Sequence, residues 1–104
     1  MTILDRQKRQ AIDQNFSSVV DFLDRKFGKS RLHLPELPSY LYKGKESKLE
    51  ITVFPNPRIA KIDVRIIDLN NYDREASFEC SYDLDGLSMA AFQRHIDDLM
   101  YKIN

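Results

Sequence analysis

Residues 48–82 contain three segments in which apolar and polar residues alternate one by one. A period of two is typical of a β-strand with one buried face and one face in water. The two prolines within residues 55–58, and the pair Asn70 and Asn71, interrupt the alternation as turns do. Because these connections are short, the three strands are expected to pair antiparallel as a meander. The apolar positions are Leu49, Ile51 and Val53, then Ala60, Ile62, Val64 and Ile66, and finally Ala76, Phe78, Cys80 and Tyr82.

Apolar residues on either side of this stretch recur instead with the period of a helix. Residues 5–27 predict a long helix whose apolar stripe is Ile12, Phe16, Val19, Val20, Leu23 and Phe27. Residues 89–103 predict a second helix, with Ser88 as its N-cap. The stripe of this second helix is Met89, Phe92, Ile96, Leu99 and Ile103.

The segment between the first helix and the alternating stretch divides into two parts. Residues 28–38 contain Pro35 and Pro38 and predict an extended linker, whereas residues 39–43 predict a first edge strand. The expected fold is α+β, in the order α-β-β-β-β-α. An antiparallel sheet of three to four strands (39–82) would carry both helices (5–27 and 88–103) on one face, within a single domain spanning residues 1–104.

The composition and charge of the chain limit the compartment in which it is expected and the kinds of partner that it can bind. The 104 residues include one cysteine and lack both a long apolar run and the apolar segment of a signal peptide, so we expect a cytoplasmic protein without a membrane partner. The net charge is zero, but residues 1–67 hold 13 Lys and Arg against 8 Asp and Glu, while residues 68–104 hold 3 against 8. This uneven layout is most typical of a well-solvated surface. The alternatives are a basic patch for a nucleic acid or an acidic protein, and self-association of the basic end with the acidic end.

The residues that could perform catalysis are few. Cys80 lies in the inward register of its strand, which favours a buried structural thiol over a nucleophile. His33 lies in the linker, and His95 has only Asp98 one helical turn away, too few groups for a zinc site. The segment 83–86 does not match the calcium-loop pattern, and the three glycines do not form a phosphate loop. We therefore expect no enzyme activity, no metal and no cofactor.

Two surfaces are candidates for binding. The first is an apolar interface of Phe54, Ile59 and Ile67, which fall in the outward register of their strands, with Arg58 beside Ile59. The second is a basic patch within residues 25–48 that would track a nucleic-acid backbone. Its members are Arg25, Lys26, Lys29, Arg31, Lys43, Lys45 and Lys48. The outward positions of the two inner strands carry charged and polar side chains, so a base-stacking platform of the RNA-recognition type is not expected.

These features favour a small non-enzymatic protein-binding module. It would be an adaptor, a chaperone-like protein or an inhibitor. One form of this hypothesis is that a phage or mobile element encodes it. Its partner would be another protein or a second copy in a homodimer. The helix–sheet–helix layout is similar to that of type III secretion chaperones, without a shared motif and without their acidic balance. The alternative is a nucleic-acid-binding regulator that uses the basic patch.

Overall fold

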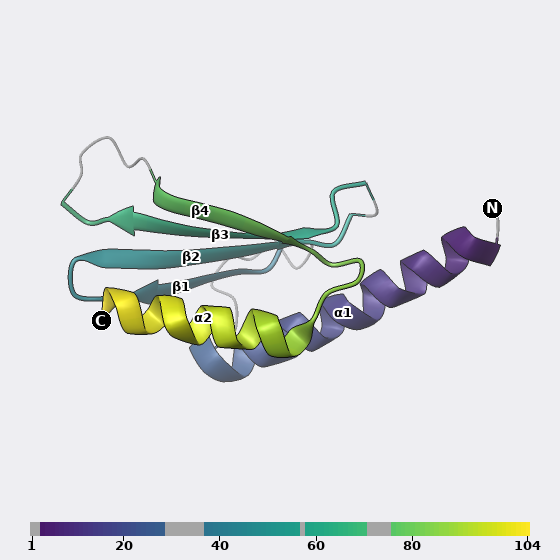
Figure 1. The fold of residues 1–104 in the computed structure, drawn as a ribbon, viewed down its shortest axis with the longest axis horizontal. Helices are drawn as coiled ribbons and strands as arrows, with labels where there is room; N and C mark the ends of the chain where they lie inside the picture. Colours follow the sequence, from purple (N-terminus) through teal and green to yellow (C-terminus); the bar gives the residue numbers. More distant parts are fainter. Residues whose placement is uncertain (1–2, 29–36, 57, 71–75) are drawn as a thin grey trace.

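The structure, a computed structural model, describes residues 3–28, 37–56, 58–70 and 76–104 (Figure 1). It contains a helix, four strands and a second helix in chain order, which confirms the predicted α+β arrangement. The elements are α1 (Ile3–Phe27), β1 (Ser39–Lys43), β2 (Ser47–Phe54), β3 (Lys61–Asp68), β4 (Ala76–Asp83) and α2 (Met89–Ile103). Most of the predicted linker, residues 29–36, lies outside the described residues.

The four strands form one antiparallel sheet in the order β1-β2-β3-β4. One row across the sheet pairs Tyr40 with Ile51, Ile51 with Val64, and Val64 with Cys80. The neighbouring row pairs Leu41, Glu50, Arg65 and Glu79 in the same way. Since successive side chains of a strand point to opposite faces, the first row faces the core and the second faces water.

Both helices lie on the same side of the sheet (Figure 1), as the sequence predicts. α1 lies nearest to β1, and α2 lies nearest to β2. The rings of Phe22 and Phe92 meet edge to face, 5.9 Å apart, and so join the two helices. The buried residues of the helices are Ile12, Val19 and Leu23 of α1, and Phe92, Ile96, Leu99 and Ile103 of α2.

Each end of α2 has a specific partner. At its start, the hydroxyl of Ser88 accepts a hydrogen bond from the backbone N–H of Ala91 at 3.3 Å, which confirms the predicted N-cap. At its end, the carbonyl of Ile103 accepts a hydrogen bond from the N–H of Lys45 at 2.9 Å. The turn between β1 and β2 therefore caps the carboxyl end of α2, where carbonyls lack intrahelical partners.

The prediction that Ile67 is exposed is wrong, because only 6% of its surface is accessible. The pairing of β3 with β4 shifts at this point: Ile66 pairs with Phe78, but Ile67 pairs with Ala76. Ser77 is thus an extra residue in β4, and its hydroxyl donates a hydrogen bond to the carbonyl of Ile66 at 3.1 Å. Such a bulge bends and twists the ladder locally, so the strict alternation of buried and exposed positions ends here.

Candidate functional site

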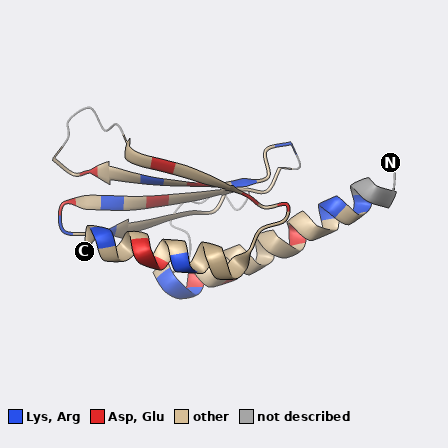
Figure 2. Cartoon of the chain, in the orientation of Figure 1, with Lys and Arg blue, Asp and Glu red and all other residues tan. Residues whose placement is uncertain are grey.

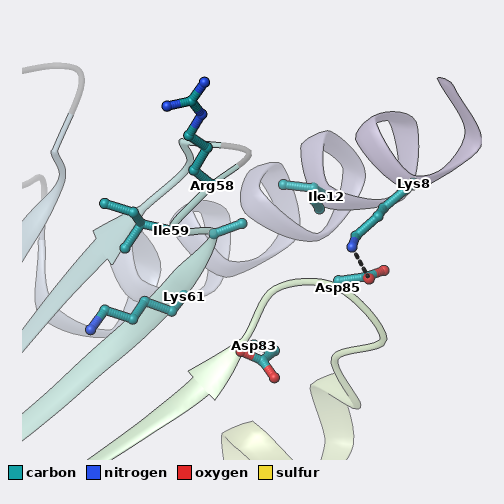
Figure 3. A pocket seen from close by; sticks show the side chains of 8 residues that line it. Lys8, Ile12, Arg58, Ile59, Lys61, Asp83 and Asp85 are labelled. Atoms are coloured by element: carbon teal, nitrogen blue, oxygen red, sulfur yellow. Dashed lines mark ion pairs between the residues drawn. The ribbon is translucent and has the colours of Figure 1, made fainter. Parts of the chain in front are cut away.

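A cleft of about 390 Å³ lies between the amino-terminal half of α1, the turn from β2 to β3, and the end of β4 (Figure 3). We call it the β2–β3 cleft. Its apolar lining consists of Ile12, Ile59 and Ala60. Its charged lining consists of Lys8, Arg58, Lys61, Asp83 and Asp85. The cleft thus gathers residues from segments that are far apart in the sequence.

Leu84 holds the walls of the β2–β3 cleft together. Its side chain is fully buried, its N–H donates to the carbonyl of Ala60 at 3.0 Å, and its carbonyl accepts from Nδ2 of Asn15 at 2.6 Å. One residue therefore joins α1, the start of β3 and the loop that leads into α2. Since a buried side chain and two hydrogen bonds meet at this one residue, we expect the relative positions of the three segments to be well defined.

The apolar part of the cleft has a buried floor and an exposed rim. Ile12 is only 2% exposed and forms the floor, whereas Ile59 at the rim is 51% exposed. Asn56 holds the turn that carries Ile59: its side-chain oxygen accepts from the N–H of Arg58 at 2.9 Å, and its carbonyl accepts from the N–H of Ile59 at 2.8 Å. An asparagine that bonds to the backbone two residues ahead is typical of a tight turn. Ile59 is therefore presented to solvent on a hydrogen-bonded turn.

The charges around the cleft are only partly paired. Lys8 and Asp85 form an ion pair at 3.6 Å across one side of it (Figure 3). Lys61 turns away from the cleft, pairing with Asp63 at 3.4 Å and lying over the ring of Phe54. Within the described part of the chain, the guanidinium of Arg58 has no ion pair, and it projects into solvent. The rim thus offers an exposed isoleucine beside an unpaired arginine.

The four residues of the predicted interface do not form one patch. Ile59 and Arg58 both line the β2–β3 cleft. Phe54 is half-buried and pairs with Lys61 across the strands, with the ammonium 5.7 Å from the centre of its ring. Ile67 is buried near the opposite end of β3. The surface available to a partner at this end of the sheet is therefore centred on Ile59 and Arg58.

Three members of the predicted basic patch, Arg25, Lys26 and Lys48, are already paired with carboxylates of the chain. Arg25 pairs with Asp21 at 3.1 Å, and Lys26 pairs with Asp97 of α2. Lys48 pairs with Glu50 at 3.1 Å and lies opposite Lys43 in the register of β1 and β2. Lys45 lies in the turn between these two strands, while Lys29 and Arg31 lie outside the described residues. Positive and negative side chains alternate along this part of the molecule (Figure 2).

The chemistry of the described residues gives no arrangement typical of catalysis. Burial, and secondarily the charge of Asp63, raises the pKa of the Cys80 thiol, which disfavours the reactive thiolate. His95 packs edge-on against the rings of Phe78 and Tyr82, at 6.3 and 5.6 Å between centroids. No group of three or more His, Cys, Asp or Glu side chains among the described residues is arranged to hold a metal ion.

Comparison with protein-family models, with curated proteins and with solved structures found no match. No helix within the described ranges is both long enough and apolar enough to cross a lipid bilayer. Function is therefore inferred from the residues themselves. The sequence pattern identified Ile59 and Arg58 as surface residues, but it did not reveal that Lys8, Asp83 and Asp85 lie beside them. These residues lie on separate segments, and no local periodicity connects them.

Proposed function

We propose that this chain is a small protein-binding module without catalytic activity, which contacts its partner through the rim of the β2–β3 cleft. The observation that carries the proposal is the exposure of Ile59 on a hydrogen-bonded turn beside Arg58, which has no ion pair within the described ranges. Protein interfaces commonly use an apolar or arginine anchor surrounded by polar groups. Ile59 would supply the apolar contact, and Arg58 would pair with a carboxylate of the partner.

The cleft behind this rim supports a protein partner over a small substrate. Its floor is the single apolar side chain of Ile12, and its walls are mainly charged. Small-molecule sites are usually lined by apolar and aromatic side chains with a few polar groups. A charged, open cleft of this kind fits a protruding side chain of another protein better than an enclosed substrate.

The nucleic-acid alternative has weaker support. Arg25, Lys26 and Lys48 each already have a carboxylate partner within the chain. Binding to phosphates would have to compete with these ion pairs, and the released carboxylates would then repel the nucleic acid. Binding to DNA or RNA that weakens steeply with salt, and that is lost on replacing Lys43, Lys45 and Lys48 by Glu, would favour this alternative.

The test compares the recovery of partners by three tagged forms of the protein from nuclease-treated lysate of the native host. They are the wild type, the variant Ile59→Asp and the control variant Leu69→Asp. Leu69 is a suitable match because it is 39% exposed and occupies the turn after β3, at the other end of the sheet.

We expect Ile59→Asp to weaken the recovered interaction by more than about tenfold, since anchor residues of interfaces contribute that much, whereas Leu69→Asp leaves it intact. Arg58→Glu should act in the same direction as Ile59→Asp. Thermal unfolding of each variant checks that the fold is preserved. Equal recovery of every partner by all forms would show that the proposed surface is not used.

A further inference from the structure

β4 is an edge strand of the sheet. β4 has eight residues and is the last strand of the sheet, pairing only with β3. Among the described residues, no strand pairs with its other edge, and Figure 1 shows no helix or strand alongside it. The N–H and C=O groups on such an edge are a template for an added strand.

The inner face of the sheet at β4 is only partly covered. α1 and α2 lie nearest to β1 and β2, so the far side of the sheet carries less helical cover. Phe78, in the middle of β4, is 37% exposed, and Tyr82 is half-buried. Both rings contact His95 of α2, which borders this strip. A strand added beside β4 would therefore place every second side chain against an apolar, aromatic strip.

The outer face of the same edge is acidic. From Ala76 to Gly86 the chain contains no Lys or Arg, and Figure 2 shows no blue segment on β4. Glu79 and Asp83 are exposed carboxylates. Glu79 forms an ion pair with Arg65 of β3 at 2.9 Å. Asp83 lies opposite Lys61 in the register, but Lys61 pairs with Asp63, and Asp83 has no ion pair among the described residues. Basic side chains on an added strand would be complementary to these positions, because opposite charges on neighbouring strands attract.

We propose that the edge of β4 binds an extended segment of a partner protein in which basic residues alternate with apolar ones. The segment pairs with the backbone of β4, its apolar side chains contact Phe78 and Tyr82, and its basic side chains lie beside Glu79 and Asp83. A second copy fits less well, because two β4 edges side by side would bring four carboxylates onto one face. This edge shares Asp83 with the lining of the β2–β3 cleft, but it does not include Ile59 or Arg58 at the rim, and the proposal does not depend on the function proposed for the cleft.

The test uses a synthetic peptide of alternating Lys and Val, about as long as β4, with both ends blocked. Its affinity is measured by fluorescence anisotropy, and its location by the NMR shifts and hydrogen exchange of the backbone amides. We expect alternate amides of β4 to become protected when the peptide binds. The matched peptide of alternating Glu and Val should bind at least about tenfold more weakly, because it places carboxylates beside carboxylates.

Two N-methylated forms of the Lys–Val peptide separate strand addition from simple charge attraction. One form carries N-methyl groups on the Lys residues and the other on the Val residues. Only one of these two sets of N–H groups can face β4, because the N–H groups of successive residues in a strand point toward opposite edges of the strand. We expect one form to lose binding and the other to retain it. Equal binding by both forms, or by the acidic peptide, would overturn the proposal.

Three variants complete the experiment. Glu79→Lys combined with Asp83→Lys should weaken binding at least about tenfold by reversing both charges. Ser81→Lys is the second test and should also weaken binding, because it places a positive charge between Glu79 and Asp83. Ser81 is exposed, and its replacement leaves the ion pair of Glu79 with Arg65 intact. Ile59→Asp should leave peptide binding unchanged, which distinguishes this edge from the cleft. Protection of β4 amides that rises with protein concentration alone would show that a second copy covers the edge, and the proposal would be wrong.

Discussion

Replacing Gly44 by Ala tests how closely the turn between β1 and β2 approaches α2. A Cβ atom on Gly44 would overlap the carbonyl oxygen of Ile103 and would lie 2.8 Å from its carbonyl carbon. Both are backbone atoms, so no rotation of a side chain can relieve the overlap. The backbone of Gly44 does not have a positive φ, and the effect of this substitution is therefore steric rather than conformational.

The expected magnitude combines three contributions. Overpacking costs about 1–3 kcal/mol. Moving the turn away also weakens the bond from the N–H of Lys45 to Ile103, which contributes about 1 kcal/mol. The loss of chain entropy in the unfolded state offsets about 0.4–1 kcal/mol of this. We therefore expect Gly44→Ala to lower the free energy of unfolding by about 2 kcal/mol.

Urea unfolding followed by circular dichroism measures this change, provided that the slope with denaturant is the same in both proteins. A chain ending at Lys102 is the matched background, because it lacks the carbonyl that Gly44→Ala would meet. In that background, we expect Gly44→Ala to be neutral or slightly stabilising, since only the entropic contribution remains. A full-length Gly44→Ala protein as stable as the wild type would refute the close approach of the turn to α2.

Two ionisable side chains give further predictions. The Tyr40 hydroxyl donates to Asp24 at 2.7 Å, and burial, then this bond and the Asp24 charge, raise the Tyr40 pKa. Because the pKa of Tyr40 is higher in the folded protein than in the unfolded chain, the neutral hydroxyl makes its full contribution to stability below about pH 10. That contribution decreases as the pH rises above about 10. Tyr40→Phe should therefore cost about 1 kcal/mol at neutral pH and reduce the alkaline loss, measured by urea unfolding at several pH values. At about pH 8, iodoacetamide should alkylate Cys80 more slowly than it alkylates free cysteine, because the pKa of the Cys80 thiol is raised. Alkylation should be faster in Asp63→Asn than in the wild type, because the charge of Asp63, the secondary cause of the raised pKa, is then absent. Equal rates in the wild type and in Asp63→Asn would contradict this.

The strands and helices could be predicted because each is specified by a local pattern. The alternation of Leu49, Ile51 and Val53 places these side chains on the buried face of β2 without reference to any other segment. The same holds for the stripe of α2 and for its N-cap at Ser88. Patterns of this kind depend on the geometry of a single element, which the sequence carries directly.

The errors lie where one segment determines the environment of another. Ile67 is buried where the ladder shifts register, and the bulge at Ser77 that causes this shift is a property of the β3–β4 pairing. Leu84 lies between two aspartates, where no local pattern predicts burial, yet its side chain is fully buried in the core and its backbone bonds to Ala60 and Asn15. The β2–β3 cleft could not be predicted for the same reason, since its lining comes from separate parts of the chain.

Photo-crosslinking in the native host shows whether a partner protein binds at the rim of the β2–β3 cleft. A photo-reactive amino acid is placed at position 85 in one protein and at position 69 in a second. Asp85 lines the cleft and its replacement leaves both Ile59 and Arg58 in place, whereas position 69 lies in the turn at the opposite end of the sheet. If a partner binds at the rim, position 85 gives a discrete protein adduct that excess wild-type protein competes away, and position 69 gives none. The same adducts from both positions, or none from position 85, would contradict binding at the rim.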